Sequence, residues 1–283
     1  MCVQSLRLQR RPYTQPMARV RPGEAANPAP PTVQRVRLRF AKRGRLRFLS
    51  HRDVARSFER AVRRAGVPVA HSHGFNPHPR MSWVGAAPTG SASEAEYLEI
   101  GLTRQVEPAA LATALDAALP DGLDVLAAAE AEGAALAERI DASRWRLELP
   151  GVEPAELRSA LAALIAQDSV VVERVTPSGR RHIDVRAALV RADVLDEGVE
   201  SGVPTGASAS TPPDRARVCA IMSAVVRQTT PAVRPDDVLG ALDVVAGLKL
   251  PVPAKATRMA QGLLDRQGDL RDPLGSDRVT TRA

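Results

Sequence analysis

Apolar and charged residues alternate near the start of the regular part of the chain. Apolar side chains alternate with arginines over residues 35–40 and again over residues 45–48, with a turn-like segment at residues 41–44 between them. A period of two is expected for a strand with one buried face. The pattern therefore predicts a β-hairpin with an apolar face and an arginine face.

A helix is predicted directly after this hairpin. Ser50 is a good N-cap, and Asp53 stands where the acidic residue of a capping box is found. An apolar stripe continues to Ala65, and Gly66 suits the position after the last helical residue. Three further helices are predicted to begin with proline in their first turn, at Pro108, Pro154 and Pro235.

Short strands are predicted between these helices, and both halves of the chain show strand–helix–strand order. Residues 152–157 echo residues 106–111 in sequence. We therefore expect an α+β fold of two subdomains, each ferredoxin-like. The predicted strands cover residues 67–70, 81–84, 97–102, 123–127, 145–149, 170–175, 180–190 and 217–225.

Composition divides the chain into segments. Residues 1–32 are rich in Arg and Pro without a hydrophobic period and are expected to be a disordered extension. Residues 33–130 form a basic first subdomain. The second subdomain spans residues 143–248, with a low-complexity insertion at residues 197–214. The last part, residues 249–283, is expected to be a polar tail, so that both ends of the chain are disordered.

The positive charge of the chain is concentrated in one segment. The 283 residues carry a formal charge of +7, whereas residues 35–64 alone carry +10, so the remainder is net acidic. Such a segment favours a polyanion such as RNA, although a solvated surface would have the same composition. Aromatic residues do not interleave with these arginines, which favours recognition of backbone or shape over base stacking. The candidate phosphate contacts are Arg37, Arg39, Arg45, Arg47, Arg56 and Arg60.

Cysteine content restricts the chemistry that the chain can perform alone. Two cysteines are too few for an iron–sulfur cluster held by three or four thiolates, and they fit a reducing cytosol. No apolar run approaches the roughly 20 residues that span a bilayer. We expect a cytoplasmic protein without a membrane partner.

Four of the five histidines fall in or near one proline-stiffened segment, residues 71–82. Their spacing matches no zinc pattern, so no metal is expected, and the alternatives are a polar pocket or histidines bound to the backbone. Glu94 and Glu96 follow on one face of a strand, where they form ion pairs or act as acid–base groups. The candidate pocket residues are His51, Asp53, Gly74, Phe75, Asn76, His78, Arg80, Glu94 and Glu96.

Three segments together resemble the radical SAM-linked proteins, a bacterial domain family of unknown function. They are residues 45–53, residues 74–82 with the sequence Gly-Phe-Asn-Pro-His-Pro-Arg-Met-Ser, and residues 93–98. In that family the domain is fused to a radical SAM enzyme or encoded beside one. The resemblance implies a radical SAM partner that carries the iron–sulfur cluster and S-adenosylmethionine, with no cofactor on this chain.

The leading hypothesis is therefore a non-catalytic accessory protein that presents a substrate to a radical SAM enzyme. The basic segment favours structured RNA, tRNA or rRNA, as the molecule to be modified. One alternative is a stand-alone hydrolase or transferase that uses His51, Asp53, His78 and Glu94. A second alternative is a scaffold whose basic face docks an acidic protein.

Overall fold

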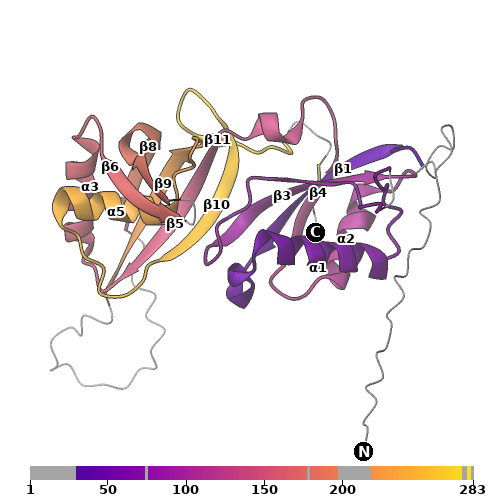
Figure 1. Cartoon of the computed structure of the whole chain (residues 1–283), viewed down its shortest axis with the longest axis horizontal. Helices are drawn as coiled ribbons and strands as arrows, with labels where there is room; N and C mark the ends of the chain where they lie inside the picture. Colours follow the sequence, from indigo (N-terminus) through magenta and orange to yellow (C-terminus); the bar gives the residue numbers. More distant parts are fainter. Residues whose placement is uncertain (1–29, 74–75, 177–178, 197–217, 276–278, 282–283) are drawn as a thin grey trace, which may run out of the picture.

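The protein is an α+β protein built around one continuous sheet of ten strands (Figure 1). The structure is a computed structural model that describes residues 30–73, 76–176, 179–196, 218–275 and 279–281. The main path of the sheet runs in the order β12-β4-β1-β3-β10-β5-β9-β8, with β2 paired to β3 and β11 paired to β10. The expected α+β class is confirmed.

The first half has ferredoxin-like topology. Its four strands lie in the order β4-β1-β3-β2 and every neighbouring pair is antiparallel. One helix follows β1 and one follows β3, as this topology requires. The elements are β1 (Gln34–Lys42), the 3-10 helix η1 (Gly44–Phe48), α1 (His51–Arg64), β2 (Met81–Val84), β3 (Ala92–Leu102), α2 (Pro108–Ala118) and β4 (Val125–Glu130).

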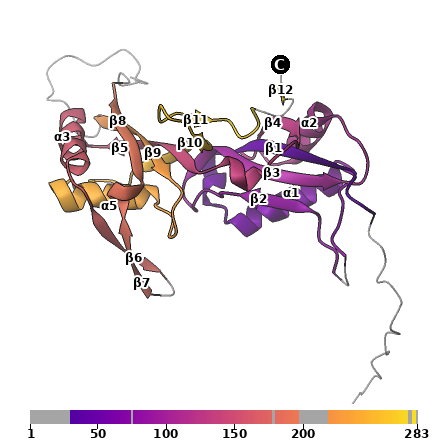
Figure 2. The same ribbon diagram turned by 90° about the horizontal axis from the view of Figure 1, so that it is seen from above.

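The second half repeats this topology. Its strands lie in the order β10-β5-β9-β8, again antiparallel throughout. A hairpin of β6 and β7 is inserted between α3 and α4 and projects from the body of the unit (Figure 2). The elements are β5 (Ala142–Pro150), α3 (Pro154–Ile165), β6 (Val171–Thr176), β7 (Gly179–Asp184), α4 (Val185–Ala188), β8 (Leu189–Leu195), β9 (Cys219–Arg227), α5 (Pro235–Ala246) and β10 (Lys255–Leu264).

The two units are joined through β10. This strand pairs antiparallel with β5 in its own unit and parallel with the start of β3 in the first unit, where Arg258 lies opposite Ser93. Figure 1 shows β10 between β5 and β3. Three small elements complete the chain: the 3-10 helix η2 (Leu136–Arg139), β11 (Leu270–Arg271) and β12 (Val279–Thr281).

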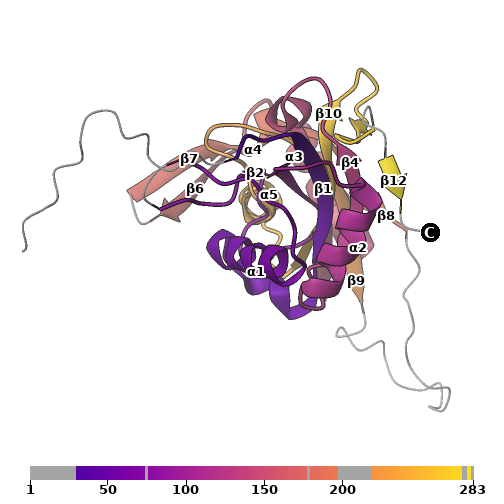
Figure 3. The ribbon, with the colours of Figure 1, turned by 90° about the vertical axis from the view of Figure 1, so that its right-hand side faces the viewer.

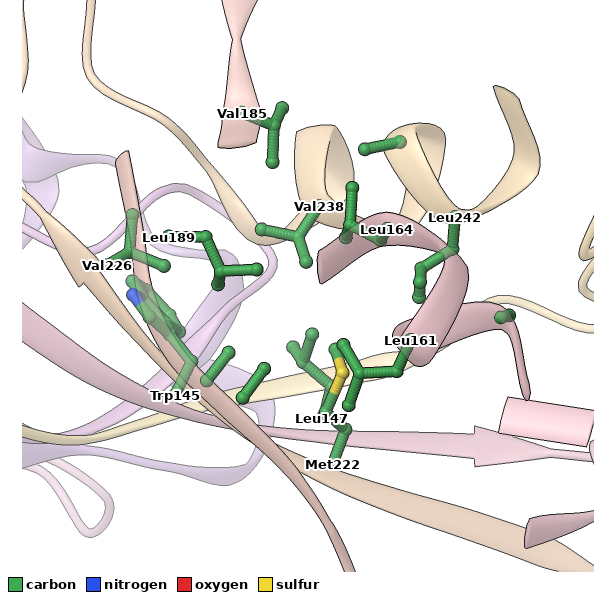
Figure 4. Packing of buried hydrophobic residues seen from close by; sticks show 14 of the residues in the cluster. Trp145, Leu147, Leu161, Leu164, Val185, Leu189, Met222, Val226, Val238 and Leu242 are labelled. Carbon is green, nitrogen blue, oxygen red and sulfur yellow. The ribbon is translucent and has the colours of Figure 1, made fainter. Parts of the chain in front are cut away.

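Each unit has its own hydrophobic core. In the first, α1 and α2 contact each other and pack on one face of β1 and β3. Figure 3 shows the two helices side by side. In the second, α3 and α5 pack on β5 and β9, with Trp145, Leu147 and Met222 beneath Leu161 and Val238 (Figure 4). The burial of such aliphatic side chains stabilises each unit by roughly 1.5–3 kcal/mol per fully buried residue.

The predicted helix starts are confirmed. The Ser50 hydroxyl accepts a hydrogen bond from the Asp53 backbone amide, and Gly66 adopts a left-handed φ of 62° after the helix. Helices α2, α3 and α5 each have proline in the first turn, where the missing amide hydrogen costs no intrahelical bond. Local capping chemistry therefore sets these boundaries.

The predicted β-hairpin over residues 35–48 is wrong. Both edges of β1 are occupied, by β3 on one side and β4 on the other, so no edge is left for a hairpin partner. The chain leaves β1 through Gly44, whose φ is 55°, and closes η1 with hydrogen bonds from Leu46 to Arg43 and from Leu49 to Leu46. The alternation over residues 45–48 is therefore that of a short 3-10 turn.

The strand predicted over residues 180–190 is divided into three elements. Strand β7 ends at Asp184, whose carboxylate accepts the amide of Ala187 at 3.3 Å and caps the short helix α4. Strand β8 then begins at Leu189 and pairs with β9. A side-chain cap inside an apolar run, invisible to a period-two pattern, causes the break.

The segment expected to be a polar tail, residues 249–283, contains the central strand β10. Its side chains Arg258 and Gln261 are 3% and 1% exposed. The second unit therefore extends well past residue 248. In the described part of the chain, no helix is long and apolar enough to cross a membrane.

Candidate functional site

Exposed arginines follow η1 and one face of α1. Arg52, Arg56 and Arg60 recur at intervals of four residues, opposite the stripe of Val54, Phe58 and Ala61 that packs on the sheet. Arg45 is exposed on η1, five residues before Ser50, the N-cap of α1. We call the exposed side chains of Arg45, Arg52, Arg56 and Arg60, together with the half-buried Arg47, the α1 surface.

Arg37 and Arg39 lie outside the α1 surface. They project from the opposite face of the sheet, because residues of a strand alternate between faces. Arg37 is 1% exposed: its Nε donates to Glu99 at 3.0 Å and its Nη1 to the carbonyl of Glu132 at 3.1 Å. Arg39 pairs with Asp272 at 3.2 Å. The guanidinium of Arg37 is occupied inside the protein, so the expected common arginine face does not exist.

Aromatic side chains accompany the α1 surface, contrary to the sequence-based expectation. Phe48 is 59% exposed, and the Arg47 guanidinium carbon lies 4.7 Å from the centre of its ring. His51 meets the edge of Trp83 with ring centres 5.5 Å apart. Exposed rings beside arginines allow base stacking as well as phosphate contact.

Asp53 is a capping residue of α1. Its carboxylate accepts the Ser50 hydroxyl at 2.6 Å, and Arg56 lies 3.8 Å away. The Ser50 hydrogen bond, aided by the positive charge of Arg56, holds the pKa of this carboxyl below its usual range. Asp53 is therefore an anion fixed at the helix start, a poor general base at neutral pH.

The histidine segment forms a short antiparallel arm. The amide of Ser72 donates to the carbonyl of His78 at 2.8 Å, and the amide of Arg80 donates to the carbonyl of Ala70 at 2.7 Å. Asn76 is exposed at the tip. Gly74 and Phe75 lie outside the described residues.

The arm borders an open groove of about 770 Å³ on the sheet face opposite α1. His78 and Arg80 line it together with Arg35, Glu99 and Glu130, whose charges partly balance. The groove is a polar surface hollow, and His51 and Asp53 lie on the other side of the sheet.

Glu94 and Glu96 have different surroundings from each other. Glu94 binds Arg43, whose Nε donates at 2.7 Å and which also reaches Asp124 at 2.8 Å; this pairing raises the pKa of Arg43. Glu96 is 5% exposed and is bound by Arg258. Glu94 is thus a surface ion-pair partner and Glu96 a buried one.

Glu96 belongs to a buried polar cluster between the two units. Arg258 donates to it and, through Nε, to Ser93 at 3.3 Å; the Glu96 carboxylate also accepts the amide of Ala87 at 3.1 Å. The Lys42 ammonium bonds the carbonyls of Ala87 and Pro88 at 3.2 and 3.3 Å. Burial lowers the pKa of Lys42, and it lowers the pKa of Arg258 as well.

Those predicted pocket residues that the structure describes are therefore not assembled into one centre. His51 and Asp53 start α1, His78 and Arg80 line the groove on the opposite sheet face, Glu94 pairs at the surface and Glu96 is buried. Among the described residues, no group of three or more His, Cys, Asp or Glu side chains could hold a metal ion. Sequence reasoning singled out Glu96 of the buried cluster but not its partner Arg258, nor Lys42 as a site residue.

The fold and these surfaces define an α+β protein of two ferredoxin-like units that share one sheet, with the basic α1 surface on the first unit and the buried polar cluster of Glu96 and Arg258 between the units. The chain belongs to the family described as "uncharacterized protein conserved in bacteria" (DUF2344), whose model matches residues 35–235. The matched range ends at the start of α5, so β10 and Arg258 lie beyond it. No curated protein matches the sequence.

Proposed function

We propose that this protein is a non-catalytic, cytoplasmic accessory protein that binds structured RNA, tRNA or rRNA, and presents it to a radical SAM enzyme. The observation that carries the RNA part is the α1 surface. It offers Arg45, Arg52 and Arg56 to solvent and adds the exposed ring of Phe48. Guanidinium forks bind phosphate in a bidentate manner, and phosphate contacts supply most of the affinity for nucleic acid.

The α1 surface keeps its positive charge because few acids oppose it. The only acidic residues of α1 are Asp53 and Glu59, and Asp53 is held by its cap. Rigid helical presentation supports binding, because the side chains are positioned before the RNA arrives. The spacing of one turn between Arg52 and Arg56 suits contact with successive phosphates on one strand.

The partner is proposed from the resemblance to the radical SAM-linked proteins. This chain has two cysteines in all, so a cluster held by three closely spaced thiolates would be carried by the partner, together with S-adenosylmethionine. The separation of His51, Asp53, His78 and Glu94 also gives a stand-alone hydrolase or transferase no assembled centre among the described residues.

Charge reversal tests the RNA part. In the variant Arg45→Glu/Arg52→Glu/Arg56→Glu we expect RNA affinity to fall by roughly a hundredfold or more at moderate salt. The slope of log K against log salt concentration should fall by about two to three, close to one for each lost phosphate contact. Filter binding of total tRNA and of an rRNA fragment across a salt series measures both quantities.

The matched control is Arg104→Glu/Arg181→Glu/Arg266→Glu. These three arginines are also exposed but lie on a loop after β3, on the β6–β7 hairpin and after β10. Both variants change the net charge equally, so a general electrostatic effect would weaken them equally. Equal loss in the two variants, or unchanged binding in the first, would contradict the proposed interface.

A further inference from the structure

A second cavity, the seam cleft, lies beside the buried polar cluster. It has a volume of about 370 Å³ and is lined from both units, by the Gly85–Ala86 turn of the first and by β9, β10 and the segment before α5 of the second. This volume is within the usual range for small-ligand sites. Its position between two units is where binding sites commonly form.

The charged groups of the seam cleft are all cationic. Arg227, Arg234 and Arg258 line it, and none of the described lining residues is acidic. Arg227 and Arg234 are exposed at the rim, whereas Arg258 lies in the interior wall. Among the described residues, Glu96 is the one carboxylate that binds Arg258, and Glu96 does not line the cleft.

One guanidinium nitrogen of Arg258, a lining residue of the cleft, is left to bind a ligand. Its Nε is bound to Ser93 and its Nη2 to Glu96, but its Nη1 has no protein partner among the described groups. Arg258 is 3% exposed and lines the cleft, so a small part of this side chain is open to a ligand there. A guanidinium nitrogen that has no protein partner can donate a hydrogen bond to an anion in the cavity.

The remainder of the wall combines apolar and amide groups. Trp145, Val226 and Val233 contribute apolar surface, and the Arg258 guanidinium carbon lies 5.6 Å from the centre of the Trp145 ring. Gln261 contributes a buried amide. Gly85 lines the cleft beside Gln261; its φ is 58°, and an added Cβ atom would stand 2.5 Å from Gln261 Oε1. Only glycine allows the turn to approach the amide so closely.

We infer that the seam cleft binds a nucleotide unit, with its phosphate held by Arg227, Arg234 and the free nitrogen of Arg258 and its base against the apolar wall. The unit is either a free nucleotide or one nucleotide of an RNA chain. Binding of a free nucleotide is independent of the proposed function, whereas binding of an RNA nucleotide rests on it and would make the cleft the place where the RNA is held for modification.

The test uses Trp145 as a reporter. The chain has two tryptophans, and Trp83→Phe leaves only Trp145 while keeping a ring beside Phe40 and Phe58. In this full-length background, Trp145 fluorescence is titrated with adenosine monophosphate and with uridine monophosphate. We expect a Kd in the millimolar range or lower for each nucleotide, and no binding of the matching nucleosides. The additional change Arg227→Ala/Arg234→Ala should weaken binding by roughly tenfold or more, since charge-assisted hydrogen bonds are lost.

The control Arg52→Ala/Arg56→Ala, also made in the Trp83→Phe background, distinguishes a free nucleotide from a nucleotide of a bound RNA chain as the ligand. Mononucleotide binding that persists in this control identifies a site for free nucleotide. Response only to an RNA oligonucleotide, lost in both the rim variant and the control, identifies a nucleotide of a bound chain and supports the proposed function as well. No response to either probe, or a response that the rim variant leaves unchanged, would overturn the inference, even if the α1 surface still binds RNA.

Discussion

A chain that ends at Lys249 is expected to lose the fold of its second unit. The truncation removes β10, which is hydrogen-bonded on both sides, to β5 and to β3. Strands β3 and β5 would then present unpaired edges. Glu96 would lose its partner Arg258, and the buried polar cluster would be exposed to water. The expected loss is roughly 5 kcal/mol or more, the whole stability of a typical domain. Urea unfolding followed by circular dichroism, with amide exchange by residue, measures it.

A chain that ends at Gly275 is the control for this truncation. It keeps β10 and also Leu274, which is 1% exposed against Tyr97 and Ile140, and removes the short edge strand β12. This control should unfold cooperatively, with protected amides in both units. If the Lys249 truncation showed the same protection in β5 and β9, the role of β10 as the strand that completes the second unit would be disproved.

Loss of the Arg258 charge is the second change with a large expected effect. Arg258→Met leaves Glu96 buried without its main partner, and such a broken buried pair typically costs 3–5 kcal/mol. Lys42 carries positive charge near Glu96, so we expect the lower end, about 3 kcal/mol, in the free energy of unfolding. Denaturant unfolding at neutral pH measures this value.

A double variant separates the effect of the Arg258–Glu96 charges on stability from the effect of the changed side-chain shape. Arg258→Met/Glu96→Gln removes both charges, so it should recover a large part of the lost stability, with a coupling energy of roughly 0.5–3 kcal/mol. The surface control Arg191→Ala breaks an exposed pair with Asp193 and should change stability by about 1 kcal/mol or less. Purely additive effects in the double variant would show that the pair itself contributes nothing.

Local rules predicted the helices and most of the strands from the sequence. Ser50, Gly66 and the prolines at the helix starts act within one turn of chain, so their effect does not depend on the rest of the fold. The hairpin prediction failed because pairing is not local. Residues 45–48 alternate correctly, but β3 and β4 occupy both edges of β1.

Strand β10 was missed because its inward positions are polar. A strand that buries Arg258 and Gln261 has no apolar alternation, so composition assigns it to a tail. The repeated order of strands and helices in the two halves of the chain did indicate this strand. The first half ends with a strand after its second helix, so the second half required a strand after the helix at residue 235.

The candidate site was predicted in part. Arg45, Arg47, Arg56 and Arg60 are on the α1 surface. Arg37 is not, because it points to the sheet face opposite α1, where it is buried and bound to Glu99 and to the carbonyl of Glu132. The buried pair of Glu96 and Arg258 could not be predicted from residue spacing, because the two residues are 162 positions apart in sequence.

The most direct test of the proposed function is an anaerobic pull-down of the tagged full-length protein from its native cell at mild salt. Proteins and RNA are identified in the same eluate, with the Arg45→Glu/Arg52→Glu/Arg56→Glu variant beside the wild type. We expect stoichiometric recovery of a radical SAM enzyme with both proteins, and enrichment of tRNA or rRNA with the wild type only. Recovery of neither a radical SAM enzyme nor RNA with the wild type would contradict the proposal.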